Sequence, residues 1–327
     1  MKTGFTVRLR PTGPWRIGSS GLRDKSDALY RSDALYSAIT SAMQLLGQSE
    51  AWLAATATAG QPPAVRFSSC FPFLGNTGLV VPPRHLWPPS PSAKVRWKGA
   101  RFIPLSAVGD LIAGKPLYED SFSLDGESQC LMPSGRPGPF REIVRKSAAV
   151  DRLTGAAEPH SITGIEFTQN AGLWCRVAFH DDAASERWTA PVQAAFRLLA
   201  DSGFGGRRSQ GWGRAERPHF SKPSHLHDEV ADHGDYWLLS VFIPGPEDQI
   251  DWTRGSYSVT TRSGRIESPV QSGGQKKHIR VIEEGSVLSA KRPPEGSAPN
   301  VAPEGFPHPV LRFGFAFAIP LHDEVFA

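Results

Sequence analysis

The hydrophobic pattern of the chain predicts strands more often than helices. Phe5–Arg10 alternates apolar and polar residues with a period of two, which is typical of a strand with one buried face. Leu173–Phe179 has the strongest strand pattern in the middle third of the chain. Further strand-like runs are shorter and cover residues 64–68, 100–103, 236–243, 256–261, 278–282, 286–289 and 311–319.

Other segments have apolar residues at helical spacing instead. The first predicted helix runs from about residue 32 to residue 46, and either Ser32 or Asp33 can cap its N-terminus. A short second helix is expected over residues 50–58. A third is expected to begin near Pro191, because proline favours the first turn of a helix and apolar residues follow it at helical spacing.

A polar, histidine-rich segment at residues 218–234 separates two parts that both begin with a strand. The length of 327 residues is about twice that of a typical domain, which fits this division. We therefore predict an α+β fold with a first domain over residues 1–222, a linker over 223–234 and a second domain over 235–327.

Charge is nearly balanced over the whole chain but unevenly placed along it. The sequence has 36 Lys and Arg residues against 32 Asp and Glu residues. From Ala51 to Gly109 it has no Asp or Glu, and this acid-free segment carries Arg66, Arg84, Lys94, Arg96, Lys98 and Arg101. The segment forms either a solvated basic surface or a surface that binds the phosphates along a nucleic-acid backbone. In the second case, Trp87 and Trp97 could supply stacking faces for bases.

A glycine-rich motif follows the third predicted helix. Residues 201–214 have the spacing G-x-G-x5-G-x-G, with two arginines at the centre and one at the end. Glycines let a backbone approach a ligand closely, so the loop can present amide N–H groups and arginines to phosphates. The alternative is a tight turn that holds a helix against a sheet. A nucleotide-binding P-loop is excluded, because the motif lacks GK[ST].

This motif resembles the C-terminal glycine loop of the RAMP superfamily, the RNA-binding subunits of CRISPR systems. Other segments are similar, in family order, to the branch that caps the 5′-handle end of the guide RNA in type III-A (Csm) complexes: residues 31–39, 67–73, 150–155, 284–287 and 308–314. The resemblance implies two ferredoxin-like (RRM-like) domains, with a β-hairpin thumb and the glycine-rich loop in the first. It also implies binding to the 5′ handle of the guide RNA (crRNA) and docking to the large polymerase-cyclase subunit and an adjacent backbone RAMP subunit.

On this basis we expect a non-catalytic RNA-binding subunit of a type III-A CRISPR effector complex, which supports antiviral defence. The expected RNA contacts are Arg31, Arg84, Lys94, Arg96, Lys98, Arg145, Lys146, Arg152, His160, Gly203, Gly205, Gly206, Arg207, Arg208, Gly211, Gly213 and Arg214. Arg31 stands where many relatives have His. A further basic stretch, residues 262–280, either extends the RNA path or faces a protein. Trp174 and Phe204 are expected in the core, whereas Trp212 is either buried or stacked on a base.

The runner-up function is a metal-independent endoribonuclease of the same superfamily that processes guide RNA, which requires a positioned histidine. Residues 11–30 contain no His, and only His160 and His278 lie in basic surroundings, so we expect no catalytic residue. Asp27 is expected to be solvated and Asp33 to cap a helix. A protein-interaction module is a third alternative, which the salt dependence of RNA binding would distinguish.

No metal, cofactor or membrane segment is expected. The linker region has histidines and an aspartate at high density, but no helical HExxH and no Cys partner: His219, His225, His227, Asp228 and His233. The three Cys residues lie far apart without a CxxC pair, which argues against a thiolate zinc site and for a reducing compartment. Because no apolar run has the length of a signal or membrane-spanning segment, a cytoplasmic location is expected.

Overall fold

The centre of the fold is an antiparallel sheet of seven strands. In this computed structural model, which describes residues 3–19, 22–89, 95–223, 234–266 and 273–321, the strand order is β13-β1-β12-β5-β6-β7, with β4 also paired to β12. The strands are β1 (Gly4–Leu9), β4 (Val65–Phe67), β5 (Phe71–Leu74), β6 (Thr77–Val80), β7 (Ile103–Pro104), β12 (Ala171–Phe179) and β13 (His219–Ser221). All residues of β12 are buried, which explains why its sequence gives the strongest strand pattern.

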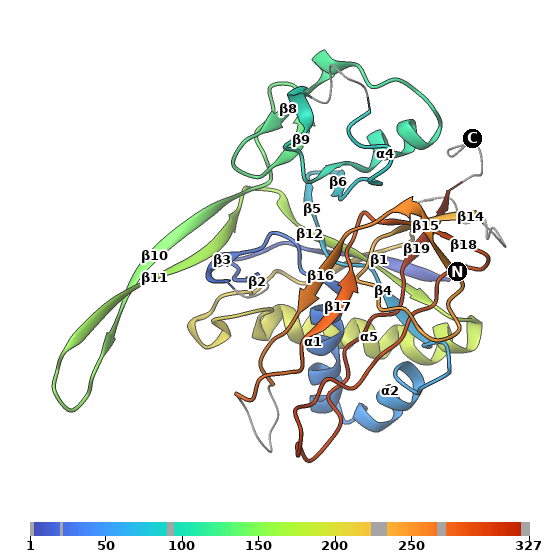
Figure 1. Ribbon diagram of the computed structural model, residues 1–327. Helices are drawn as coiled ribbons and strands as arrows, with labels where there is room; N and C mark the ends of the chain where they lie inside the picture. The colour runs from blue at the N-terminus through green and yellow to red at the C-terminus, as the bar shows by residue number, and fades with distance from the viewer. Residues whose placement is uncertain (1–2, 20–21, 90–94, 224–233, 267–272, 322–327) are drawn as a thin grey trace.

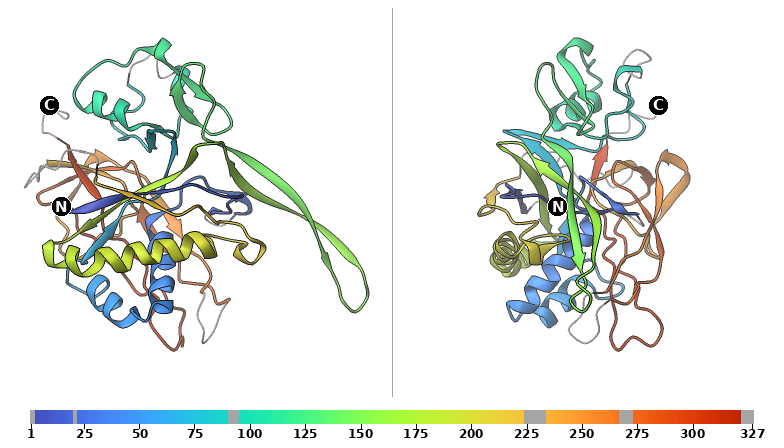
Figure 2. Two further views of the ribbon diagram at one scale, coloured as in Figure 1. Left: turned by 180° about the vertical axis from the view of Figure 1, so that it is seen from behind. Right: turned by 90° about the vertical axis from the view of Figure 1, so that its left-hand side faces the viewer.

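Helices α1 (Ser32–Leu45) and α5 (Asp182–Ser202) lie on one face of this sheet, and α2 (Ser49–Thr56) packs against α1 (Figures 1 and 2). The chain runs through β1, α1, β4 and β5, β12, α5 and β13 in that order. Together with the strand order, this gives the β-α-β-β-α-β arrangement of a ferredoxin-like domain. The predicted α+β class is confirmed.

The third helix begins earlier than the sequence pattern predicted. α5 starts at Asp182 instead of near Pro191, and the Asp181 side chain caps it by accepting a hydrogen bond of 2.7 Å from the Ala184 N–H. Pro191 therefore lies inside the helix, where it has no N–H to donate to the preceding turn. The prediction was wrong because it read a proline as a helix start although a better capping residue lay ten positions upstream.

A long β-hairpin projects from the sheet (Figure 1). It consists of β10 (Phe140–Val150) and β11 (Ala157–Phe167), eleven residues each, joined by a turn over residues 151–156. Most side chains of β10 are exposed, and at the turn Leu153 is 96% exposed. This hairpin is the predicted thumb.

Residues 95–139 form a small lobe that lies beyond β6, at the top of Figure 1. Besides β7, the lobe contains α4 (Leu105–Ile112), a short 3₁₀ helix η1 (Glu119–Ser121), β8 (Phe122–Asp125) and β9 (Cys130–Pro133). Its buried residues Trp97, Phe102 and Leu131 belong to the same apolar cluster as Phe71 and Phe73 of the main sheet. The lobe is therefore an extension of the core.

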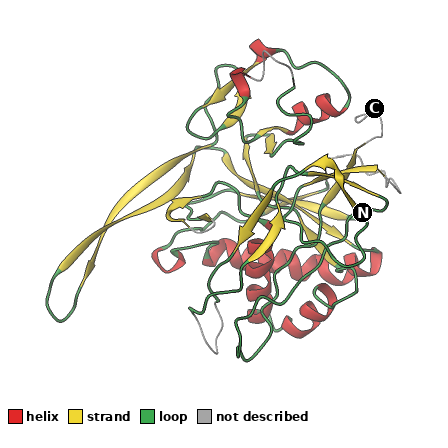
Figure 3. Cartoon of the chain, in the orientation of Figure 1, coloured by secondary structure: helices red, strands yellow, loops and turns green. Residues whose placement is uncertain are grey.

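The C-terminal part is built from strands. They are β14 (Gly234–Leu238), β15 (Ile250–Ser256), β16 (Val259–Arg262), β17 (Ile279–Ile282), β18 (Val287–Ala290) and β19 (Ala318–Leu321). Four of them form a sheet in the order β15-β18-β14-β19, and β16 pairs with β17. Within residues 234–266 and 273–321 there is no helix (Figure 3), so this part has a sheet but not the two helices of the expected ferredoxin-like domain.

The two parts share one core. Phe317 lies in the same apolar cluster as Phe71, and the ring of Phe313 stacks on that of Tyr36 with centroids 4.1 Å apart and an angle of 14° between the planes. Aromatic residues from the C-terminal part thus complete the core of the N-terminal part. Most of the predicted linker, residues 224–233, lies outside the described residues.

All three cysteines, Cys70, Cys130 and Cys175, are buried and free, and burial raises the pKa of the Cys130 thiol to about 12. Among the described helices, none is long and apolar enough to span a membrane. The remaining short elements are β2 (Gly18–Ser19), β3 (Leu22–Ser26) and the 3₁₀ helix η2 (Arg208–Gln210).

Candidate nucleic-acid interface

Three segments that are far apart in the sequence meet at the base of the thumb. Trp15 pairs with Ile165 of β11 through two backbone hydrogen bonds of 2.8 Å, so residues 14–16 extend the edge of the hairpin. The glycine-rich loop, residues 203–214, lies against the same segment, and two of its glycine N–H groups donate to carbonyl oxygens there at 2.8 and 3.0 Å. We call this meeting point of thumb base, residues 14–16 and glycine-rich loop the junction.

The glycines of the loop allow close packing of the backbone. Gly205 and Gly213 have φ angles of 71° and 80°, and a Cβ at either position would overlap a backbone carbonyl, that of Arg16 or Phe204 respectively. The N–H groups of Phe204, Gly206 and Gly213 all donate to carbonyls of the junction itself. Of the two interpretations of the motif, the tight turn explains these glycines. The arginine side chains of the loop remain candidates for contacts with phosphates.

The junction carries five arginines, which are Arg16, Arg145, Arg207, Arg208 and Arg214. Arg16 donates to the Thr163 carbonyl of β11 at 3.1 Å, and its side chain runs along Gly206. Arg207 and Arg208 are half-buried, and Arg214 is exposed. Guanidinium groups gathered around a loop suit the recognition of phosphate oxygens. Arg16 is not among the residues predicted from the sequence, where residues 11–30 stood out only for their lack of histidine.

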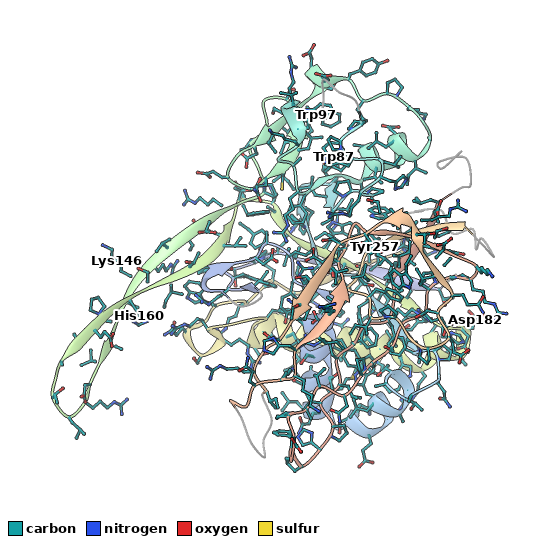
Figure 4. The ribbon with its side chains drawn as sticks, in the orientation of Figure 1. Trp87, Trp97, Lys146, His160, Asp182 and Tyr257 are labelled. Carbon is teal, nitrogen blue, oxygen red and sulfur yellow. The ribbon has the colours of Figure 1, made fainter. Side chains whose placement is uncertain are left out.

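The thumb presents cations on both of its faces. Arg145 pairs with Ile162 and Ser147 pairs with His160, so Arg145 and His160 share the face toward the glycine-rich loop. Lys146 lies on the opposite face, and Figure 4 shows Lys146 and His160 along the middle of the thumb. Arg152 lies in the turn at the tip. The predicted RNA contacts of the thumb are thus spread along its length.

Three of the six cations in the acid-free segment contact carbonyls or carboxylates from other parts of the chain. Arg66 is buried and donates to two backbone carbonyls, those of Glu295 and Ala316, at 3.2 and 3.1 Å. Arg101 forms an ion pair of 2.7 Å with Asp27, and Arg96 lies 3.6 and 3.4 Å from the carboxylates of Glu119 and Asp120. Carboxylates from outside the segment therefore supply the charge that its sequence lacks.

One of the two tryptophans expected to stack on bases, Trp97, is packed away from solvent. Trp97 is only 1% exposed, and its ring stacks on Trp87 with centroids 5.9 Å apart and planes 2° apart (Figure 4). The expectation that both rings would stack on bases is wrong for Trp97. Arg84 and Lys98 are exposed, and their RNA contacts stay predictions, whereas Lys94 lies outside the described residues.

Asp27 and Arg31 join the N-terminal part to the C-terminal part. The Arg31 guanidinium pairs with Glu284 and, at 3.0 Å, with Glu283, and it lies 3.9 Å from Asp27. Burial would raise the pKa of Asp27, but Arg101 and Arg31 outweigh it and the pKa is lowered. The expectation of a solvated Asp27 is therefore wrong. The RNA contact predicted for Arg31 stays a prediction, for a side chain that is already engaged by carboxylates.

Asp33 has a similar role. It is buried, it pairs with Arg262 at 2.8 Å, and it also pairs with Arg312. The N-cap of α1 is Arg31 and makes no side-chain capping bond, so the predicted cap at Ser32 or Asp33 is wrong. Burial opposes ionisation of Asp33, yet the two arginines lower its pKa to about 2. Arg262, from the further basic stretch, is consequently a structural residue.

The structure also places the residues that were expected in the core and some of the histidines. Trp174 and Phe204 are buried as predicted, and Trp212, which was left open, is 5% exposed. His278 lies 3.0 Å from the side-chain nitrogen of Gln275. Among the described residues no three His, Cys, Asp or Glu side chains are placed to hold a metal ion, while three of the clustered histidines lie outside those residues, so the metal prediction remains untested.

This chain thus combines a ferredoxin-like sheet with a long hairpin thumb and a glycine-rich loop that directly follows helix α5. Residues 231–321 match the family model of the CRISPR Csm4 C-terminal domain. This match agrees with the sequence resemblance to the type III-A branch of the RAMP superfamily, and it covers the C-terminal part of the chain.

Solved structures show the same fold over nearly the whole chain. A Csm3-Csm4 subcomplex of the type III-A interference complex contains a chain with 15% identity and a TM-score of 0.65, covering 97% of this chain and 99% of that one. Csm1-Csm4 cassettes with cA4 and with pppApA contain chains with 17% and 16% identity and TM-scores of 0.60 and 0.59, covering 98% of both chains in each case. No curated protein matches the sequence.

Proposed function

We propose that this chain is the non-catalytic subunit of a type III-A CRISPR effector complex that binds the 5′ handle of the guide RNA. The observation that carries the proposal is the junction, where Arg16, Arg207 and Arg208 lie beside the base of a thumb that bears Arg145. Proteins hold single-stranded RNA through phosphate and 2′-hydroxyl contacts that set its register, and arginines supply the phosphate contacts.

Docking to other subunits is the second half of the proposal. The solved relatives were crystallised as Csm1-Csm4 and Csm3-Csm4 complexes. By analogy, this chain binds the large polymerase-cyclase subunit and an adjacent backbone RAMP subunit, with residues 1–222 and 235–327 as its two domains. The exposed thumb, with Val144 and Val150 each 61% exposed, is suited to contact a neighbouring subunit.

The non-catalytic assignment follows from general acid–base chemistry. Metal-independent cleavage of RNA needs an imidazole that is held beside the scissile phosphate. Residues 14–16 and 203–214 of the junction contain no histidine, and His160 lies on a strand of the thumb. With enzyme in excess over a labelled guide precursor, we expect no cut. A specific cut that is lost in His160→Ala would instead establish the endoribonuclease.

A double variant tests the RNA-binding proposal. Arg207→Ala/Arg208→Ala should weaken binding of a fluorescein-labelled guide RNA with a repeat-derived 5′ end, because each lost charge-assisted contact costs about 1.5–3 kcal/mol. Fluorescence anisotropy of the full chain measures the affinity. Arg254→Ala/Arg292→Ala, which removes two exposed arginines of the C-terminal part, is the matched control. Equal affinity of the Arg207/Arg208 variant and wild type would remove the glycine-rich loop from the RNA site.

A further inference from the structure

The Trp212 ring occupies the space that Gly164 leaves on the thumb. The ring packs against Gly164 of β11, where a Cβ would overlap the Cζ3 atom of the indole. Gly164 is buried, and only 5% of Trp212 is exposed. Because any side chain at Gly164 would displace the ring, the glycine in the strand and the tryptophan in the loop form a matched pair.

The face of the same ring holds Arg145. The guanidinium carbon of Arg145 lies 5.4 Å from the centroid of the Trp212 ring, which is within the range of a cation–π contact. Arg145 lies on the same face of the thumb as Gly164, since Ile143 pairs with Gly164 and Arg145 is two residues further along β10. An arginine on an exposed strand would otherwise be free to sample many rotamers, so this contact restricts it.

The backbone of Trp212 also holds the backbone of a second arginine of the junction, Arg207. Its N–H donates to the Arg207 carbonyl at 3.3 Å, and the Gln210 N–H donates to the same carbonyl at 2.9 Å. Arg207 has a φ of 63°, a left-handed conformation that is unfavourable for a residue with a Cβ. Such strain is retained where surrounding contacts determine the conformation.

We propose that Trp212 is a positioning residue that couples Arg145 of the thumb and Arg207 of the glycine-rich loop into one binding site for the phosphodiester backbone of single-stranded RNA. The proposal rests on the proposed function. It adds that Trp212 positions the arginines, while the arginines contact the RNA. The indole ring stacks on no base, because it is buried between the two segments. Its role is to hold the Arg145 guanidinium and the Arg207 backbone in place before RNA arrives, which lowers the entropy cost of binding.

The effect of the ring can be separated from that of its volume. Trp212→Phe keeps an aromatic face under Arg145, whereas Trp212→Leu keeps an apolar side chain without one. Affinity of the full chain is measured by anisotropy with the guide RNA and with fluorescein-labelled oligo(U), in chains that carry either Arg145 or Arg145→Met. With Arg145 present, the leucine variant should bind about two- to five-fold more weakly than the phenylalanine variant, which is the size of an exposed cation–π contact.

With Arg145→Met, this difference between the two Trp212 variants should disappear, and the dependence of log K on log salt should fall by about 0.7 for the lost phosphate contact. Equal affinities of the phenylalanine and leucine variants, or the same difference in both Arg145 backgrounds, would overturn the proposal while leaving RNA binding intact. If both Trp212 variants unfold, the Arg145→Met variant alone tests the proposal. Unchanged affinity and an unchanged salt slope would then show that Arg145 contacts no phosphate, which would overturn it. A wild-type chain that binds neither RNA would overturn this proposal together with the proposed function.

Discussion

Two regions of this protein have basic sequences, but their arginines have different surroundings in the fold. In the acid-free segment, Arg66, Arg96 and Arg101 are drawn into contacts with carbonyls or carboxylates from other parts of the chain. At the junction, Arg207 and Arg214 lie on a loop whose backbone is held by internal hydrogen bonds. The difference shows that a run without acids in the sequence does not establish a positive surface, because its counter-charges can come from elsewhere.

The same contrast separates structural arginines from those proposed to meet RNA. Arg262 and Arg312 are buried and share the Asp33 carboxylate, so they stabilise the contact between the two parts of the chain. Burying ions is costly unless every partner is present, and removal of one partner leaves an uncompensated charge. Variants at structural arginines should therefore change stability, and variants at the junction should change RNA affinity.

The largest effect is expected from Asp33→Ala. It leaves Arg262 and Arg312 buried without their carboxylate, which should lower the free energy of unfolding by about 3–5 kcal/mol. Urea unfolding followed by circular dichroism measures it. Asp120→Ala is the control, since its side chain is fully exposed and its pair with Arg96 should add little to stability. An unchanged urea midpoint for Asp33→Ala would refute the role of this network in joining the two parts.

A smaller effect is expected from pH. Because the pKa of Asp33 is about 2 in the folded chain against an ordinary value of 3.8, its contribution to stability is present above the ordinary value. The contribution is lost as the pH falls through the folded value, and Asp27, whose pKa is also lowered, acts in the same direction. The free energy of unfolding of Asp33→Asn should therefore fall less steeply with acid than that of wild type. Parallel curves would contradict the paired state of Asp33.

Local patterns predicted most of the fold. The period-two alternation of residues 5–10 and the apolar run of residues 173–179 correspond to β1 and β12, and the helix over residues 32–45 was expected. The thumb was expected from a family resemblance. The described residues of the C-terminal part lack the two expected helices, which shows the limit of that reasoning, because resemblance to short segments does not specify what lies between them.

The partners of buried charges could not be predicted. Asp33 bonds to residues 229 and 279 positions away, and nothing in its neighbourhood distinguishes it from a helix cap. Arg16 was not predicted for a related reason. Its place at the junction depends on contacts with Thr163 and the glycine-rich loop, which only the fold brings near. Arg207, Arg208 and Arg214 were found because glycine spacing is a local signal.

The central claim is that the junction supplies more of the contacts to the RNA backbone than the acid-free segment does. The most direct test is the salt dependence of guide-RNA binding for wild type, Arg207→Ala/Arg208→Ala and Arg96→Ala/Lys98→Ala. Since each phosphate contact to a single strand contributes about 0.7 to the slope of log K against log salt, the first variant should lose about 1.4. The second should lose at most about 0.7, because Arg96 is already paired with Glu119 and Asp120. The reverse result, a slope reduced only in the Arg96/Lys98 variant, would contradict this account.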